Sequence, residues 1–215
     1  MTSHERGELS RTRASLHGVA ELLLAGPQFE TSRRIELRTR PAGFGTVTEP
    51  DLRVEADHLV MGSRRISMTG RTYDEIGADA GVTPRRLDDV YSDGPGLEVG
   101  DEVSIDRQAA LFLARAFQDG DTALRRFCPG AEPVLWPEHF DIAIEVEQVT
   151  YGLSPGDSFL DEPYGYVSVS RRLGGEFWNA PFGAARALGS LGSTSALEEF
   201  FVAGREAWSE SGHGW

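Results

Sequence analysis

Residues 140–150 read Phe-Asp-Ile-Ala-Ile-Glu-Val-Glu-Gln-Val-Thr, and this stretch decides the fold. Its apolar and polar side chains alternate, so in an extended chain they face opposite sides. One side carries Phe140, Ile142, Ile144 and Val146, and the other carries His139, Asp141, Glu145 and Glu147. Antiparallel strands commonly have one buried and one exposed face, whereas central strands of a doubly wound parallel sheet are apolar on both. The sequence therefore predicts an α+β fold with an antiparallel sheet as its framework.

Shorter alternating stretches on either side of this one predict further strands at residues 34–40, 52–61, 65–68 and 164–170. Residues 41–45 indicate a break, and Gly62-Ser63 indicates a hairpin. Helical spacing predicts three main helices that cover the sheet, at residues 14–26, 107–127 and 195–208. We expect Gly26-Pro27 to end the first helix and His17 to lie on its polar side. The last helix has a predicted capping box, Ser195 with Glu198, and an apolar stripe of Leu197, Phe200, Phe201, Gly204 and Trp208.

Irregular stretches divide the chain. Residues 1–12 are polar and without period, which predicts a mobile tail, and residues 209–215 predict another. Residues 92–100 contain Asp-Gly-Pro-Gly and predict a connection between an N-terminal half, 13–91, and a C-terminal half, 101–208. These halves form either two domains or one. Each half is predicted to contain a helix, a strand, a glycine-rich break and a strand, an order consistent with internal duplication of a helix-strand-strand unit.

The charge of the chain disfavours polyanionic partners. Its 21 basic residues, all Arg, stand against 34 Asp and Glu, which gives a formal net charge of −13. Nucleic acid and anionic lipid would be repelled unless the arginines are segregated on one face, so we expect neither as a partner. The absence of Lys excludes both Schiff-base catalysis and a phosphate-loop lysine.

Cysteine content indicates a reducing compartment. Cys128 is the one cysteine, so neither an intrachain disulfide nor a cysteine-based zinc cluster can form. The apolar run at residues 19–26 is interrupted by Glu21 and is shorter than the roughly 20 apolar residues of a membrane span. We therefore expect a cytoplasmic protein.

Gly152-Leu-Ser154-Pro-Gly156 matches the nucleophile-elbow pattern of hydrolases. In that elbow the residue after the serine donates its backbone N–H to the oxyanion, and here Pro155 has no N–H. The pattern therefore favours a tight turn between strands over a catalytic serine.

Residues 72–83 resemble the first helix and turn of a helix-turn-helix, and a recognition helix would follow at residues 84–91. Asp88 and Asp89 would face DNA phosphates in that arrangement. A short structural helix is the favoured interpretation.

The densest block of unusual residues runs from 135 to 182. It contains Trp-Pro-Glu-His-Phe-Asp at 136–141, Tyr-Gly-Leu-Ser-Pro-Gly-Asp at 151–157, Glu-Pro-Tyr at 162–164 and Phe-Trp-Asn-Ala-Pro-Phe-Gly at 177–183. These stretches resemble an uncharacterised actinobacterial protein family that carries similar motifs. The resemblance is specific in the C-terminal half and implies membership of the family, but it implies no activity.

Candidate site residues lie in this block. His139 and Asp141 are two residues apart on the polar side of the predicted strand, a spacing at which an imidazole and a carboxylate can position a proton or share a metal. Asp157 and Glu162 are the expected additions, although a polar strand face is more often simply solvated. Asn179 either binds a ligand or fastens the turn before Pro181. Aromatic side chains near these groups are typical of ligand pockets: Trp136, Tyr151, Tyr164, Trp178 and Phe182.

Two hypotheses of function follow. The preferred one is a small-ligand or protein-binding module with an aromatic and acidic pocket, because no catalytic signature is intact. The alternative is a small-molecule enzyme in which His139 acts as general base or metal ligand, Asp141 or Glu162 orients it, and Trp178 and Asn179 bind substrate. The residues specify no cofactor, metal, ligand identity or oligomeric state.

Overall fold

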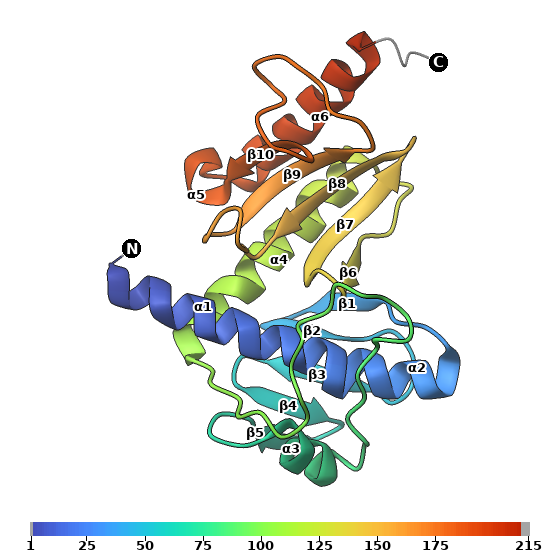
Figure 1. Ribbon diagram of the computed structural model, residues 1–215, viewed down its shortest axis with the longest axis vertical. Coiled ribbons are helices and arrows are strands. Elements are labelled where there is room, and N and C mark those ends of the chain that lie inside the picture. The colour runs from blue at the N-terminus through green and yellow to red at the C-terminus, as the bar shows by residue number, and fades with distance from the viewer. Residues whose placement is uncertain (1, 212–215) are drawn as a thin grey trace. The chain divides into compact units, whose positions relative to one another are not determined.

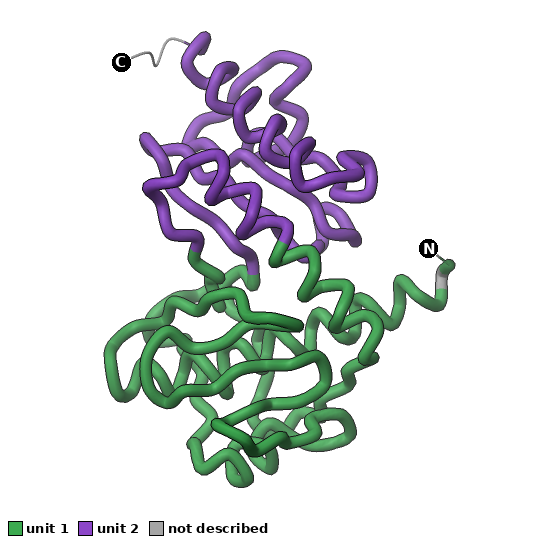
Figure 2. The backbone as a smooth tube through the Cα atoms, turned by 180° about the vertical axis from the view of Figure 1, so that it is seen from behind, with its two compact units in different colours: residues 1–118, 134–140 green, residues 119–133, 141–215 purple. Residues whose placement is uncertain are grey.

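The computed structural model describes residues 2–211 and divides into two compact units (Figure 2). Unit 1 runs to Gln118 and includes Val134–Phe140; unit 2 comprises Asp119–Pro133 and the residues from Asp141 onward. The strand pairings within each unit are antiparallel, so the predicted α+β class with an antiparallel framework is confirmed. The boundary between the units falls within a helix, α4 (Arg107–Phe127), and not at residues 92–100.

The sheet of unit 1 contains six strands. Their spatial order is β6 (Val134–Trp136), β1 (Leu37–Arg40), β2 (Gly43–Thr46), β3 (Leu52–Glu55), β4 (His58–Met61) and β5 (Arg64–Ser67). The first predicted strand is shorter than expected and begins at residue 37. Residues 43–45, predicted as a break, form a strand, because the chain reverses earlier, at Pro41-Ala42 with Ala42 at φ 60°.

The predicted strand 52–61 is in fact a hairpin. Ala56 has φ 54° in the two-residue turn between β3 and β4, a conformation that usually calls for glycine. The sequence carries no turn signal at this point, which explains the error. The next turn, with Gly62 at φ 57°, confirms the predicted hairpin.

Residues 3–12 are helical, so the mobile tail predicted at 1–12 is wrong for this described part; Met1 lies outside the described residues. Helix α1 (Ser3–Gly18) starts with a capping box in which Thr2 and Glu5 exchange side-chain and backbone hydrogen bonds. Leu9 and Thr12 are 2% and 1% exposed, so this helix also packs into unit 1. The Thr-x-x-Glu signal was present in the sequence.

The helical run continues past Gly26-Pro27, where we expected it to end. A π-helical segment, η1 (Val19–Ala25), joins α1 to α2 (Gly26–Ser32) (Figure 1). In a π-helix the carbonyl of Leu22 would accept a hydrogen bond from the N–H of residue 27, but Pro27 has no N–H. The Leu22 carbonyl accepts a hydrogen bond from the Arg85 N–H at 3.0 Å instead. The wider turn thus accommodates Pro27 within the helix.

Helix α3 (Tyr73–Ala80) and the first part of α4 complete unit 1. Helix α3 is capped by Thr72 and Glu75, and it is the short structural helix expected there. Residues 84–91 contain no helix, so a recognition helix is absent from this described segment. Helix α4 has the bounds predicted from its spacing.

The sheet of unit 2 has the order β10 (Gly183–Ala187), β9 (Tyr164–Val169), β8 (Val149–Ser154) and β7 (Asp141–Val146). The stretch that predicted the fold is therefore not one strand but a hairpin. Glu147 and Gln148 form its turn with φ values of 53° and 65°, the conformation of a type I′ turn. Their residue types gave no warning, because Asn-Gly is the usual signal for such a turn.

Helix α6 (Thr194–Glu210) covers one face of this sheet, after the short helix α5 (Leu188–Leu191) (Figure 1). Its N-cap is Ser193, so the predicted capping box at Ser195 is wrong by two residues. The predicted apolar stripe is confirmed, since all its members are buried: Leu197, Phe200, Phe201, Gly204 and Trp208.

Two finer expectations about the architecture are not confirmed. The six strands of unit 1 and the four of unit 2 do not repeat one plan, and the helices outnumber the expected three, so neither the duplication nor the three-helix cover is confirmed. No helix in residues 2–211 combines the length and the apolarity needed to cross a membrane.

Candidate functional site

The predicted site residues are divided between the two units. Trp136 and His139 belong to unit 1, where Trp136 ends β6 and His139 lies in the turn that follows. The others belong to unit 2: Asp141, Tyr151, Asp157, Glu162, Tyr164, Trp178 and Asn179. Neither unit by itself contains the complete predicted set.

We expected His139 and Asp141 to share a polar strand face, but the structure places them differently. Phe140 between them has φ 52°, so the chain turns there and β7 begins at Asp141. Alternation of side chains holds only in extended backbone, and the left-handed residue ends it. His139 is exposed, whereas Asp141 is 7% exposed and accepts a hydrogen bond from the Tyr166 hydroxyl.

Tyr166 reaches Asp141 by lying over a glycine. A Cβ on Gly152, the register neighbour of Tyr166 on β8, would lie 2.5 Å from the tyrosine hydroxyl oxygen, so the ring needs glycine there. Burial, followed by the nearby Asp141 carboxylate, raises the pKa of Tyr166 well above its ordinary value. This pair is a buried polar link from β9 to the start of β7.

Asp157 organises the loop that follows β8. Its Oδ1 accepts hydrogen bonds from the backbone N–H groups of Phe159 and Leu160 at 2.8 and 3.2 Å. Its Oδ2 accepts a hydrogen bond from the Tyr164 hydroxyl at 2.6 Å, and its own N–H donates to the Leu160 carbonyl at 2.9 Å. Side-chain hydrogen bonds of this kind fix a turn locally, so the loop holds its shape without a partner.

Phe159 is the aromatic residue that this loop exposes. It is 44% exposed, and its ring meets Tyr164 and Phe182 edge-on at centroid distances of 5.9 and 5.1 Å. After Leu160 come two exposed acidic residues, Asp161 and Glu162. An aromatic ring beside carboxylates can receive the stem and charged head of an Arg or Lys side chain. We call residues 157–162 the Phe159 loop.

Two predicted ligand-binding residues have structural contacts instead. Tyr151 is 1% exposed and packs against Phe127 and Phe201 at centroid distances of 4.6 and 6.1 Å. The Asn179 amide donates to the Ala185 carbonyl at 3.1 Å and accepts from the Ala185 N–H at 2.9 Å. The alternative role for Asn179, fastening the local turn, accounts for both of these hydrogen bonds.

Trp178 and Glu162 are not joined by any hydrogen bond or ring contact that the described residues make. The Trp178 ring meets Phe177 edge-on at 5.0 Å, and Phe177 stacks on Phe200 of α6 at 5.5 Å. Glu162 is exposed and precedes β9. The indole therefore belongs to the packing of the 171–182 segment on α6.

His17, which sequence analysis assigned to the polar side of a helix, lies in an enclosed position of unit 1. Its ring stacks on Phe140 at 5.4 Å, and its Nε2 donates to the Pro137 carbonyl at 2.8 Å. Burial lowers the pKa of His17 from 6.5 to about 4, although backbone hydrogen bonds to Pro137 and Glu138 act in the opposite direction. His17 is therefore neutral at pH 7.

Glu21 is a second polar residue in the interior of unit 1. It is 2% exposed, and its carboxyl accepts a hydrogen bond from the Tyr91 hydroxyl at 2.8 Å. Burial raises its pKa despite this hydrogen bond. His17 and Glu21 are four residues apart in the sequence. This spacing is typical of side chains on one face of a helix, so it is the sequence signal that could have indicated the pair.

His17→Gln should remove part of the acid sensitivity of unit 1. The unfolded chain protonates His17 below pH 6.5 and the folded chain only near pH 4, so this residue reduces the free energy of unfolding as the pH falls between these values. The reduction is at most about 3 kcal/mol, and a neutral glutamine that keeps the donor to Pro137 would avoid it. Urea unfolding at pH 4.5 and 7 measures the effect.

His4→Gln is the matched control, because His4 lies in the same helix and its side chain is 79% exposed. The raised pKa of Glu21 lowers the free energy of unfolding as the pH rises above 4.5, opposite to the effect of His17. The test therefore compares the pH dependence of the variants with one another and not the pH dependence of one protein alone. If the free energy of unfolding of His17→Gln differed between pH 4.5 and 7 as much as that of the unmodified protein, the assignment of a lowered pKa to His17 would be contradicted.

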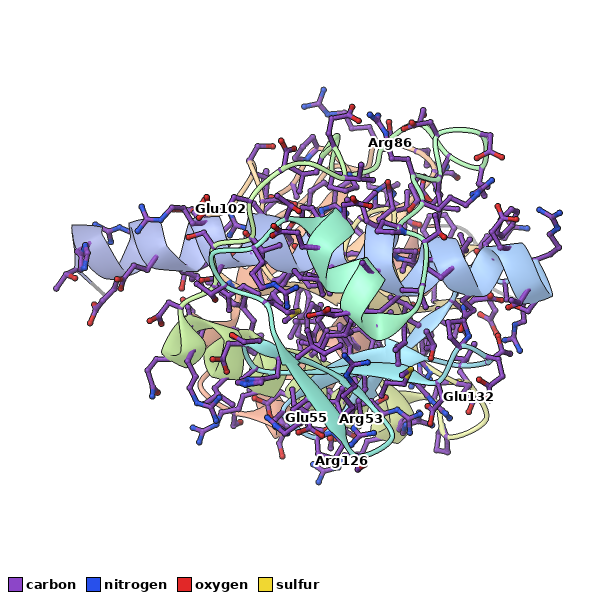
Figure 3. The ribbon with its side chains drawn as sticks, turned by 90° about the horizontal axis from the view of Figure 1, so that it is seen from below. Arg53, Glu55, Arg86, Glu102, Arg126 and Glu132 are labelled. Carbon is purple, nitrogen blue, oxygen red and sulfur yellow. The ribbon has the colours of Figure 1, made fainter. Side chains whose placement is uncertain are left out.

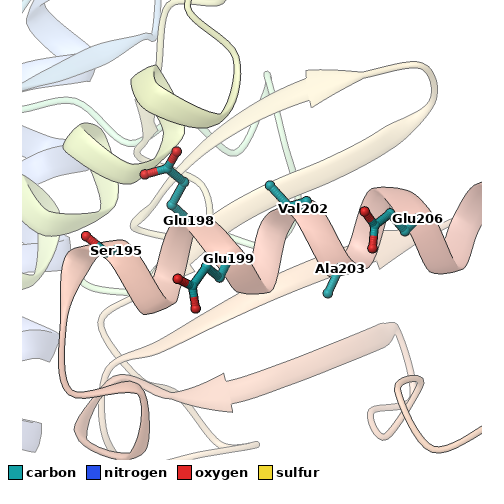
Figure 4. A pocket seen from close by; sticks show the side chains of 6 residues that line it. All are labelled: Ser195, Glu198, Glu199, Val202, Ala203 and Glu206. Carbon is teal, nitrogen blue, oxygen red and sulfur yellow. The ribbon is translucent and has the colours of Figure 1, made fainter.

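A surface cavity of about 290 Å³ lies on the outer side of α6 (Figure 4). Its lining combines three carboxylates with small and apolar groups: Ser195, Glu198, Glu199, Val202, Ala203 and Glu206. All come from one helix, and no aromatic ring is among them. This surface is acidic like the Phe159 loop but lacks an apolar anchor.

Comparison with known proteins adds no relative: no family model, no curated protein and no solved structure matches the chain. Within residues 2–211, no group of three or more His, Cys, Asp or Glu side chains is arranged to hold a metal ion.

Proposed function

We propose that the protein is a binding module without chemistry of its own, and that unit 2 binds a positively charged segment of a partner protein through the Phe159 loop. The observation that carries this proposal is a hydrogen-bonded loop that holds an exposed ring and contains three exposed acidic residues, Asp157, Asp161 and Glu162. A loop already fixed in its binding shape loses little conformational entropy on association. Aromatic anchors also contribute a disproportionate share of interface energy.

The charge of the protein supports a cationic partner. The formal net charge is −13, and the exposed residues Asp161 and Glu162 lie two and three residues after Phe159 in the same loop. Long-range attraction would raise the association rate of a basic segment, while Phe159 would supply short-range affinity. A cytoplasmic location fits the single cysteine and belongs to this proposal.

The enzyme hypothesis has less support. His139 is exposed in a turn of unit 1, Asp141 already accepts the Tyr166 hydroxyl, and Glu162 is exposed. General acid-base chemistry needs a base held within hydrogen-bond reach of its orienting group. An NMR titration of His139 with and without Glu162→Gln tests it, because coupling between them would shift the titration.

Phe159→Ala should weaken binding of a fluorescein-labelled hexaarginine peptide by about tenfold, the loss expected for one aromatic anchor. Fluorescence anisotropy at about 50 mM salt keeps exposed charges partly unscreened. Phe112→Ala is the matched control, since Phe112 is 46% exposed against 44% for Phe159. Its affinity should equal that of the unmodified protein.

A charge control separates the loop from general ionic attraction. Asp161→Asn with Glu162→Gln removes two charges from the Phe159 loop, and Glu198→Gln with Glu199→Gln removes two from α6. The first variant should bind several-fold more weakly than the second. Equal affinities for the two charge variants, together with unchanged affinity for Phe159→Ala, would refute the proposal.

A further inference from the structure

Arginine side chains gather on one face of the unit 1 sheet. The register pairs Arg38 with Gly45, Gly45 with Arg53, Arg53 with Val60 and Val60 with Arg65. Residues directly opposite in neighbouring strands point to the same face, so three arginines form a row across β1, β3 and β5. Arg40, two residues after Arg38, joins them on that face.

The other face of the same strands is the core face, with Leu37, Leu52, Val54, Leu59 and Ile66 buried. Figure 3 shows Arg53 and its neighbour Glu55 on the side of β3 that faces away from α1. Strand β2, between β1 and β3, contributes only Gly43 and Gly45 to the arginine face. Strand β2 therefore places no side chain on this face between the arginines of β1 and Arg53.

The glycines are required by the approach of β3. A Cβ on Gly45 would lie 2.7 Å from the Leu52 carbonyl oxygen, and one on Gly43 would collide with the Val54 carbonyl. Any side chain at these positions would force the strands apart. The lack of β2 side chains between Arg38 and Arg53 is thus a consequence of how this sheet is built.

The carboxylates on this face leave the positive charge incompletely balanced. The Glu55 carboxylate accepts a hydrogen bond from Arg53 at 2.8 Å and also forms an ion pair with Arg65, so one carboxylate balances two guanidinium groups. Asp51 lies 4.0 Å from Arg40, the limit of an ion pair. Arg38 is exposed and forms no ion pair with any residue between 2 and 211.

Arg40 is the arginine of this face whose guanidinium group has an unsatisfied buried donor. Its Nε is buried and finds no hydrogen-bond acceptor in the described part of the chain. A buried charged donor without an acceptor costs more than the roughly 1–3 kcal/mol of a neutral one. Burial, and then the neighbouring charges of Arg38 and Arg53, lower the pKa of Arg40, as expected where guanidinium groups repel one another.

We propose that Arg38, Arg40 and Arg53 form a binding site for a compact phosphate-bearing anion. Guanidinium groups present paired N–H donors that match phosphate oxygens, and a multiply charged phosphate offsets their repulsion. The site lies in unit 1 and is independent of the Phe159 loop in unit 2. A long polyanion fits less well, because Glu55 and Asp51 border the cluster and the net charge is −13.

Isothermal titration calorimetry with pyrophosphate and with inorganic phosphate, at about 20 mM ionic strength, tests this site. Arg40→Gln should weaken pyrophosphate binding by about tenfold or more, the loss of one charge-assisted contact. Arg64→Gln removes the same charge from β5, on the opposite face of the sheet, and it should change affinity less than twofold. Glu55→Gln should tighten binding several-fold, because it frees Arg53 and Arg65.

The outcomes separate the possibilities. Tighter binding of pyrophosphate than of phosphate identifies a diphosphate group as the recognised chemistry, and equal binding identifies a single phosphate. Equal weakening by Arg40→Gln and Arg64→Gln would mean diffuse ionic attraction and would overturn the proposal. So would the absence of pyrophosphate binding at 10 mM (about one hundred times the expected dissociation constant of roughly 0.1 mM for a few such contacts). Tighter binding of a single-stranded oligonucleotide than of pyrophosphate would likewise overturn it.

Discussion

Phe140→Ala is expected to lower the free energy of unfolding of unit 1 by about 3–5 kcal/mol. Phe140 is 1% exposed, and its ring lies edge-on to Phe44 and Phe117 at 5.3 and 5.2 Å and stacks on His17 at 5.4 Å. The ring therefore joins a strand, two helices and the turn before β7. Its removal leaves a cavity that rigid neighbours on three sides cannot fill.

Phe140→Leu and Phe112→Ala are the controls. Both residue 140 variants share the backbone φ of 52°, so their difference reports the side chain and not the turn. Leucine should retain most of the stability, and alanine at the exposed Phe112 should change it by less than about 0.5 kcal/mol. Urea denaturation followed by circular dichroism measures all three. A loss below 1 kcal/mol for Phe140→Ala would show that this ring is not part of the core.

All five tyrosines are expected to remain protonated in the folded protein at pH 10. For each, burial is the main cause of a raised pKa, which reaches about 12 for Tyr151. Hydrogen bonds to carboxylates add to the effect at Tyr91, Tyr164 and Tyr166. The hydroxyls donate to these carboxylates, so losing the proton would place two negative charges side by side.

The consequence is steep alkaline unfolding of unit 2. Above pH 10 an unfolded chain releases the protons of Tyr151, Tyr164 and Tyr166, while the folded unit keeps them, so stability falls as the pH rises toward the folded pKa values. Three protons correspond to a loss of about 4 kcal/mol per pH unit. Below pH 10 these groups are protonated in both states and contribute no pH dependence.

Absorbance of tyrosinate at about 295 nm, recorded together with circular dichroism, measures this behaviour. The tyrosinate absorbance should rise and the circular dichroism of the folded state should be lost in one cooperative transition above pH 10. Tyr166→Phe should remove one third of the slope. A gradual tyrosinate titration centred near pH 10, with the circular dichroism unchanged, would contradict the assigned burial.

The sequence predicted several elements correctly where hydrophobic period and turn chemistry agreed. The stripe of α6 and the bounds of α4 were found because helical spacing persists over many residues. Turns were missed where ordinary residues adopt positive φ, at Ala56, Phe140 and Glu147. No local propensity marks such residues, and tertiary packing holds them there. The π-helical passage through Pro27 was missed for a similar reason, because its free carbonyl is satisfied from a distant segment.

The candidate site was predictable only in part. Asp157 and Tyr164 were named and are linked by a hydrogen bond, whereas Phe159, the exposed residue between them, was not singled out. Exposure is a property of the folded loop and not of residue type. The arginine face could have been found, because Arg38 and Arg40 alternate on one predicted strand face, but joining them to Arg53 required the strand register.

Hydrogen exchange of the full chain, with and without the hexaarginine peptide, tests the proposed binding most directly. Slowed exchange at the backbone amides of Phe159 and Leu160, lost in Phe159→Ala and retained in Phe112→Ala, is the predicted result. Protection confined to α6, or equal protection in both variants, would contradict binding through the Phe159 loop.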